Sequence, residues 1–581
     1  MSTNHTDPAT RQGTSTGDTG LIPAWVRRNH WMNQVRIHAL MAPDEPALKA
    51  DGHTTTWEQL NARMDSLAAA LQRRGLQTGD RVVLLTLNHA EAILGVLGVN
   101  RAGGIAVPIN ARLTPPEIAY IVEDADADTI IVDRALAPLV AGVTGISERL
   151  RRIIVVDPGG VAAGDAGQAA AAASAAETTA GAEAGTAAGA LEAIGGLPTE
   201  SFAALAAEDP AGFTAVDVAE STVCLIMYTS GTTGRPKGAM LDHINMFAQA
   251  GTTNSGRTDP RQDVVILTAP LFHIAAWGQV AANLVSGAPT IVYPLGGFDP
   301  VDLLDTYERE GATVVFNVPQ QWQAICQAVA RGKPGRPGEV KGEPWRLNLK
   351  HLSWGAAPAS ESVLRAMEET FPDAEVTAAF GQTEMSPVTC SLDAEDSVRK
   401  IGSIGKPIPT MAARIVDPAM NDVTPGEVGE LVYQGPNLMQ GYWRKPEETA
   451  KAFTGGWFHS GDLVRADDEG FLYIVDRAKD MIISGGENIY CAEVENVLFD
   501  HPAVLEAAVY GRPDERWGEV PIAAVALREG AQLTLDELRT WLDDRLARFK
   551  QPKDLVFVDT LPRNASGKVR KVDLRRADAA D

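Results

Sequence analysis

The sequence predicts an α/β protein with largely parallel sheets, followed by a small α+β domain. The first observation is a series of short, continuous apolar runs, which are typical of strands buried on both faces. The second is that segments with helical apolar spacing separate these runs. The third is a change of pattern after Asp462, where short strands and turns replace the alternation. A chain of 581 residues is long enough to bury more than one core.

The first clear element is a helix expected over 56–75. Thr56 and Gln59 can form a capping box at its start, and Gly75 suits the position after its end. Apolar residues recur between them at helical spacing, which favours one buried face. Buried strands are then expected over 81–87, 129–132, 153–156, 223–228, 264–268, 290–293 and 313–318.

Composition divides the chain into domains. Residues 1–20 are polar and predict a disordered leader, whereas 158–197 are rich in Ala and Gly and have no apolar face. We interpret the second segment as a solvated insertion or linker without an assigned function. The remainder predicts a large N-terminal domain over 21–476 and a small C-terminal domain over 477–581, with a helix over 535–549.

Charge and cysteine usage exclude several classes of protein. Hydrophobic residues make up 45% of the chain, as in globular proteins, while the net charge of −24 argues against nucleic acid or an anionic membrane as the main partner. The four cysteines are far apart and predict reduced thiols in a cytoplasmic protein. No signal peptide or transmembrane segment is expected. Small-molecule partners are expected, and a homodimer and a peripheral membrane contact stay open.

The most informative segment is 228–238, which follows the expected strand 223–228. Its hydroxyls, glycines and Lys237 suit a loop that binds oxyanions, because they supply backbone and side-chain donors and a positive charge. It is not a Walker A loop, because Gly238 rather than Ser or Thr follows the lysine. Composition alone also allows a surface turn. The candidate phosphate-binding residues are Thr229, Ser230, Gly231, Thr232, Thr233 and Lys237.

This loop resembles, almost letter for letter, the phosphate loop of the adenylate-forming superfamily, which includes acyl-CoA synthetases, luciferases and peptide-synthetase adenylation domains. The resemblance extends from about residue 30 to 572, apart from the insertion. It implies a large N-terminal domain of stacked α/β sheets with a small barrel-like part, and a small mobile C-terminal domain. It also implies ATP and Mg²⁺ as cofactors and CoA as co-substrate.

Further motifs gain a role through the resemblance. In Phe380-Gly-Gln-Thr-Glu384, Phe380 would pack on adenine, Thr383 would contact the α-phosphate, and Glu384 would hold Mg²⁺ together with Thr229. The neighbouring Gly381 and the small residues Gly355, Ala356 and Ala357 would line the nucleotide pocket, and Trp354 the acyl pocket.

The C-terminal motifs imply ribose binding, a hinge and a catalytic lysine. Asp462 and Arg477 would bind the ribose hydroxyls, and Lys479 lies where the family places its domain hinge. The loop Ser484, Gly485 and Gly486 would line the pantetheine channel, and Lys568 would act in adenylation. These residues imply two steps, in which ATP first forms an acyl-adenylate and CoA then displaces AMP after the small domain rotates.

The segment 270–277 bears on the substrate. His273 occupies the place where amino-acid-activating relatives carry an Asp, so an amino acid would lack its anchor, and we favour His273 as a pocket wall over a general base. Trp277 matches a gating indole of long-chain fatty-acyl-CoA synthetases, although it could be a core aromatic. The sequence thus predicts a medium- or long-chain fatty-acid–CoA ligase in lipid metabolism. An aryl- or small-acid–CoA ligase and a luciferase-like or non-CoA relative stay open.

Overall fold

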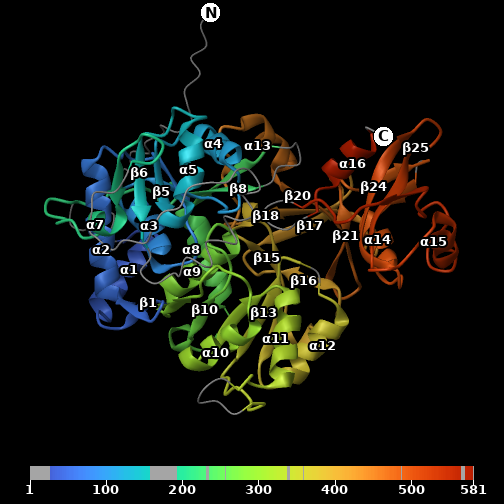
Figure 1. The fold of residues 1–581 in the computed structure, drawn as a ribbon, viewed down its shortest axis with the longest axis horizontal. Coiled ribbons are helices and arrows are strands. Elements are labelled where there is room, and N and C mark those ends of the chain that lie inside the picture. The colour runs from blue at the N-terminus through green and yellow to red at the C-terminus, as the bar shows by residue number, and fades with distance from the viewer. Residues whose placement is uncertain are drawn as a thin grey trace, which may run out of the picture.

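The computed structural model describes residues 27–157, 193–229, 235–255, 257–335, 341–357, 359–485, 487–563 and 569–579. The expected leader 1–20 and most of the expected insertion lie outside this part of the chain. Figure 1 shows a large body built from two sheets and their helices, with a smaller C-terminal domain beside it. No described helix combines the length and the hydropathy that crossing a membrane requires.

The first sheet of the large body has eight strands in the order β19-β9-β8-β4-β3-β5-β6-β7. All neighbours from β8 to β7 are parallel, whereas β9 pairs antiparallel with both β8 and β19. The strands are β3 (Arg81–Leu85), β4 (Ile105–Pro108), β5 (Thr129–Asp133), β6 (Arg152–Val156), β7 (Thr199–Ser201), β8 (Val223–Thr229), β9 (Lys237–Asp242) and β19 (Gly441–Tyr442).

The second sheet has thirteen strands in the order β17-β18-β20-β21-β16-β15-β14-β13-β12-β10-β11-β1-β2. Its central strands, from β14 to β1, are parallel, and antiparallel strands extend it at both ends. The strands are β1 (Pro46–Ala50), β2 (His53–Thr56), β10 (Val265–Leu267), β11 (Thr290–Val292), β12 (Val314–Asn317), β13 (His351–Gly355), β14 (Glu375–Gly381), β15 (Val388–Leu392), β16 (Ser403–Pro407), β17 (Ala412–Val416), β18 (Gly429–Gln434), β20 (Phe458–Ala466) and β21 (Leu472–Arg477).

The helices of the large body fill the space between the sheets and cover their outer faces. One core joins α8 and α9 to strands of both sheets, and a second core lies beneath α10, α11 and α12 (Figure 1). These helices are α1 (Trp31–Met41), α2 (Trp57–Arg73), α3 (Ala90–Arg101), α4 (Pro115–Asp124), α5 (Ala137–Thr144), α7 (Phe202–Leu205), α8 (His243–Asn254), α9 (Ile274–Ser286), α10 (Pro300–Glu310), α11 (Pro319–Arg331), α12 (Glu361–Thr370) and α13 (Pro446–Ala452). The seven expected strands and the capping box of Thr56 with Gln59 are confirmed.

The C-terminal domain packs helices on a five-stranded sheet. The expected helix over 535–549 is shorter than predicted, because the chain leaves α15 after Leu542 in a series of tight turns. Leu546 is nevertheless buried, so the apolar stripe is kept without a continuous helix. The elements are β22 (Ile482–Ser484), β23 (Glu487–Ile489), α14 (Cys491–Phe499), β24 (Val504–Asp514), β25 (Gly518–Leu527), α15 (Leu535–Leu542), β26 (Asp554–Phe557) and α16 (Lys571–Asp578).

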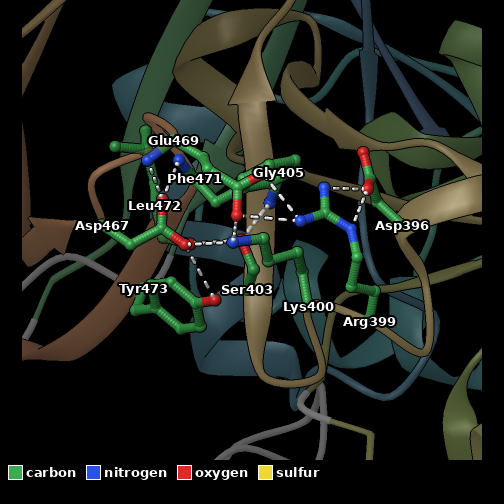
Figure 2. Close-up of polar contacts among 10 residues, drawn as sticks. All are labelled: Asp396, Arg399, Lys400, Ser403, Gly405, Asp467, Glu469, Phe471, Leu472 and Tyr473. Atoms are coloured by element: carbon green, nitrogen blue, oxygen red, sulfur yellow. Dashed lines mark hydrogen bonds and ion pairs between the residues drawn. The ribbon is translucent and has the colours of Figure 1, made fainter.

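A polar network fixes the turn between β20 and β21, the two strands that carry Asp462 and Arg477. Lys400 Nζ lies 2.7 Å from Asp467 Oδ2, and Arg399 reaches both Asp396 and Glu469 (Figure 2). Asp467 Oδ1 also accepts the backbone N–H groups of residues 469 and 471, which closes the turn. The network therefore holds the end of the hairpin opposite to its candidate ribose-binding residues.

Two buried histidines make stability depend on pH. The rings of His30 and His243 stack with centroids 4.3 Å apart, and burial lowers the pKa of both below the ordinary value of 6.5. The unfolded chain takes up protons near pH 6.5, whereas both rings of the folded chain take them up only at lower pH. The unfolded state therefore binds more protons, and stability falls as the pH drops below about 6.5, by at most about 1.4 kcal/mol per pH unit for each ring.

We expect His243→Phe to reduce this loss, because a ring remains against His30 while one titrating group is removed. Urea unfolding at pH 7.5 and 5.5 measures how much the free energy of unfolding falls between these two pH values. His53→Gln, at an exposed position on β2, is the matched control and should retain the wild-type difference. An equal loss of stability in all three proteins would contradict the assignment.

Candidate active site

A cleft of about 3800 Å³ runs between the large body and the C-terminal domain. Residues from both sheets and from the segment that joins the two domains line it. It brings together eleven of the predicted site residues, namely Thr229, Lys237, His273, Ala356, Ala357, Phe380, Gly381, Thr383, Glu384, Arg477 and Lys479. Ser230, Gly231, Thr232, Thr233, Gly486 and Lys568 lie outside the described residues.

The base of the candidate phosphate loop is a β-hairpin. Thr229 at the end of β8 pairs with Lys237 at the start of β9, and the Thr229 hydroxyl donates to the Lys237 carbonyl at 3.4 Å. Because β8 and β9 are antiparallel neighbours, the Thr229 hydroxyl and the Lys237 ammonium group come from adjacent strand ends. This arrangement suits an oxyanion that needs both a donor and a charge.

The C-terminal end of α4 holds this hairpin from outside. Tyr228 Oη donates to Asp124 Oδ2 at 2.8 Å, and Lys445 Nζ lies 2.7 Å from Asp124 Oδ1. Trp443 Nε1 donates to the Asp124 carbonyl at 3.0 Å. A single residue of α4 therefore ties β8 to the segment that follows β19. This role could not be predicted from the sequence, because an acidic residue at a helix end is common.

Tyr442 on β19 links two predicted phosphate-site residues. Its hydroxyl donates to Glu384 Oε1 at 2.9 Å, and Lys237 Nζ lies 5.1 Å from its ring centroid. Glu384 is buried on a short 3₁₀ helix over 383–385, and this burial raises the pKa of its carboxyl, whereas the Tyr442 hydrogen bond lowers it. A buried carboxylate that Tyr442 links to Lys237 suits Mg²⁺ bound to phosphates.

Asp462 and Arg477 are direct partners across β20 and β21. Arg477 Nε lies 2.9 Å from Asp462 Oδ1, and Gln382 Nε2 lies 3.5 Å from Asp462 Oδ2. Asp462 is buried behind Arg477, which lines the cleft. Ribose hydroxyls would therefore meet the guanidinium first and compete with it for the carboxylate.

Close backbone contacts leave no room for side chains at two of the predicted nucleotide-pocket glycines. A Cβ atom on Gly355 would lie 2.2 Å from the Ala379 carbonyl oxygen, and one on Gly381 would lie 1.8 Å from the Pro387 carbonyl oxygen. Both contacts exclude any side chain at these positions. Phe380, beside them on β14, lines the cleft, and the predicted adenine stacking requires only a ring face.

His273 lies at the cleft, whereas both predicted acyl-pocket indoles do not. His273 caps α9, where its Nδ1 accepts the Ala275 N–H at 3.2 Å, and the surrounding protein lowers the pKa of its exposed ring. Trp277 is 1% exposed and packs edge-on against Trp31 at 5.8 Å. It is therefore a core residue, which corrects its prediction as a gate in the acyl pocket.

Trp354 requires a similar correction. It points from β13 into the second core, beneath α10 to α12, with 7% of its surface exposed. The alternation of a strand places its neighbour Ser353 on the opposite face, toward the cleft. Ser353, rather than Trp354, is thus the residue of this pair that lines the cleft.

The hinge candidate Lys479 lines the cleft among several cations. Burial lowers the pKa of its ammonium group, as do Arg477, Arg575 and Lys571 nearby. Gly485, predicted for the pantetheine channel, has φ of +61° and its backbone N–H donates to the Trp517 carbonyl at 2.7 Å. Neither Gly485 nor Ser484 lines the cleft in this arrangement of the domains.

Comparison with known proteins identifies the family. Residues 35–443 match the AMP-binding enzyme family, and residues 493–568 match the AMP-binding enzyme C-terminal domain. The chain therefore belongs to the AMP-binding enzyme family.

Individual relatives cover nearly the whole chain. Feruloyl-CoA synthase of an Amycolatopsis species is 36% identical, over 93% of this chain and 97% of its own. Indoleacetate–CoA ligase of Aromatoleum aromaticum is 32% identical (94% and 97%), and a long-chain-fatty-acid–CoA ligase of Mycobacterium tuberculosis is 31% identical (96% and 98%). The o-succinylbenzoate–CoA synthetase of Bacillus subtilis, solved with ATP and magnesium ion, superposes with a TM-score of 0.73 at 27% identity (95% and 99%).

These comparisons support ATP-dependent, AMP-forming acid–CoA ligation as the class of activity. ATP and CoA fit the family as substrates, as the motifs implied. The fatty-acid prediction is not specifically supported, because aryl-acid ligases are more similar to this chain than the fatty-acid ligase is.

We expect Tyr442→Phe to weaken magnesium-dependent nucleotide binding. The substitution removes the hydrogen bond to Glu384 but keeps the ring beside Lys237. The Mg²⁺ concentration needed for half-maximal ATP binding, measured by calorimetry, should rise by about tenfold. Tyr433→Phe, which removes another buried hydroxyl near Thr389, is the control. The same Mg²⁺ dependence in both variants would show that Tyr442 does not support Glu384.

Proposed function

We propose that this protein is an ATP-dependent, AMP-forming CoA ligase for an aryl acid. The face that β12, β13 and β14 turn toward the cleft supports this substrate. The residues of these parallel strands that line the cleft on this face are Val314, Phe316, His351, Ser353, Glu375, Thr377 and Ala379. Most side chains in the middle of this face are small or carry hydroxyls, so a planar ring can lie against it.

The dimensions of the face favour an acid of moderate length. Gly355 lies at the nucleotide end of β13 and His351 at the other end, where its Nδ1 lies 3.0 Å from Glu375 Oε2. Four strand residues span about 13 Å. A ring with a short side chain fits within this distance, and its polar substituents would meet hydroxyls. A long alkyl chain would extend beyond the apolar part of the face and reach the polar side chains of His351 and Glu375.

The relatives named for feruloyl-CoA, indoleacetate and 2-succinylbenzoate support the same class of acid. Each substrate contains a ring. Medium- or long-chain fatty acids are the second candidate, and the support for them is the 31% identical fatty-acid ligase.

In the proposed first step, a carboxylate oxygen of the acid attacks the α-phosphorus of ATP, and the bond to pyrophosphate breaks. Lys237 and the Thr229 hydroxyl would bind the phosphates, and Thr383 the α-phosphate. Glu384 would hold the magnesium ion, which neutralises phosphate charge when bound. Neutral His273 would form the wall beside the acid, because an ionised carboxylate needs no base.

In the proposed second step, the CoA thiol attacks the acyl carbon and AMP leaves with the bonding electron pair. We propose that Lys568 serves the first step and that the loop 484–486 serves the second. Both belong to the proposed small domain, 477–581, so a rotation at Lys479 would exchange them at one acyl centre. The position of Lys479 on the cleft wall and of Ser484 away from it is compatible with such an exchange.

An acid panel tests the substrate class. Pyrophosphate release should be at least about tenfold more efficient, in kcat/KM, with hydroxylated cinnamates or indoleacetate than with octanoate or palmitate. Acyl-CoA should then form without oxygen, which separates a ligase from a luciferase-like oxidase. Highest efficiency with palmitate would favour the second candidate, and formation of ADP would reject the reaction itself.

Lys568→Ala should separate the two steps. Adenylation should fall by about 10²–10³-fold, the scale for one donor to developing charge. Thioester formation from supplied acyl-adenylate should persist. Lys553→Ala, at an exposed lysine of the same domain, should affect neither step. Equal losses in both steps for Lys568→Ala would contradict its assigned role.

A further inference from the structure

The short connection from β10 to α9 carries side chains to the acid part of the cleft. Phe272 and His273 line the cleft, whereas Leu271 between β10 and these residues is buried. Pro270 has no N–H, so this turn cannot form a regular backbone ladder. The position of the two cleft residues therefore depends on how the backbone at 269–271 is held.

Asn88 holds this backbone from the other sheet. Its Nδ2 donates to the Ala269 carbonyl at 3.0 Å, and its Oδ1 accepts the Leu271 N–H at 2.9 Å. The Asn88 amide thus hydrogen-bonds the backbone on both sides of Pro270, at the Ala269 carbonyl and at the Leu271 N–H. Asn88 is 4% exposed, so both hydrogen bonds form in a water-poor environment where loss of either leaves a buried group unpaired.

Trp277 completes the clamp from α9. Its Nε1 donates to the Leu271 carbonyl at 2.6 Å. Leu271 therefore has its N–H bound by Asn88 and its carbonyl bound by Trp277, two side chains from different parts of the fold. Because Trp277 is buried in the core, it does not line the cleft as a gate. From the same position its indole N–H holds the turn at Leu271.

The loop that carries Asn88 is itself fixed. It follows β3, and Asp133 at the end of the adjacent β5 accepts the Leu87 N–H at 2.7 Å and contacts His89 Nε2 at 2.7 Å. β3 lies two strands from β8, which leads into the phosphate loop. Asn88 therefore connects the sheet that bears the phosphate loop to the turn that bears Phe272 and His273.

We propose that Asn88 and Trp277 are positioning residues for acid recognition. Through the turn 269–273, they set where Phe272 and His273 lie relative to the bound phosphates, and so how the acid's carboxylate meets the α-phosphorus. This inference rests on the proposed ligase function. Small displacements of Phe272 and His273 matter, because a shift of about 1 Å in the position of a reacting group can lower the rate by about 10²-fold.

Asn88→Leu and Trp277→Phe test the clamp. Leu replaces the amide by an apolar group of similar size, and Phe keeps an aromatic ring against Trp31. Each variant should raise the KM for the preferred acid on the order of tenfold and change the ratio of kcat/KM between two acids of different shape. The dissociation constant of Mg·ATP, measured by calorimetry without acid, should stay within about twofold. Because both side chains hold Leu271, the increase in log KM for the acid in the double variant should be smaller than the sum of the increases in the two single variants.

Asn100→Leu is the matched control. Asn100 is also a buried amide, with Nδ2 donating to the Cys224 carbonyl at 2.8 Å and Oδ1 accepting the Trp31 Nε1–H, but it lies at the other end of α3. The Asn100→Leu substitution should lower the midpoint of thermal unfolding without changing acid selectivity. Unchanged selectivity in Asn88→Leu or, if that variant does not fold, in Trp277→Phe would overturn the inference. Failure of the wild-type protein to activate any acid would instead reject the proposed function.

Discussion

The shared core around α8 and α9 is the constraint on which the site depends. It joins strands of both sheets into one body, so that the phosphate-loop hairpin of the first sheet faces the carboxyl ends of the parallel strands of the second. Neither sheet alone contains the site. Thr229 and Lys237 come from one sheet, whereas Phe380 lies on a strand of the other and Thr383 and Glu384 follow that strand. Hydrogen bonds between the two sheets, from Asn88 to the backbone at 269 and 271 and from Tyr442 to Glu384, then fix details that apolar packing leaves free.

Local patterns were the parts of the structure that the sequence predicted well. Continuous apolar runs identify strands because a strand in a parallel sheet is buried on both faces, and the Thr56 capping box needs only four neighbouring residues. The helix over 535–549 was predicted too long, because Leu546 is buried from a turn rather than from a helix. Apolar periodicity does not distinguish these two cases.

The site was predicted in outline through motif resemblance, whereas its supports were not. Tyr442 is separated from Glu384 by 58 residues and Asn88 from Leu271 by 183, and no local pattern reports such contacts. The two tryptophans were placed wrongly for a related reason. A motif gives the order of residues along a strand or helix, but the side that faces the cleft depends on which neighbouring sheet or helix covers the other side.

The pair His351 and Glu375 lies at an open end of the face proposed to bind the acid. Glu375 has 65% of its side chain exposed, so the cleft at the amino ends of β13 and β14 leads to bulk water rather than to a closed wall. A ring substituent that points away from the carboxylate can therefore project out of the protein. Such an opening suits acids linked at that position to a bulky reporter group or to a solid support, since the attachment need not enter the fold.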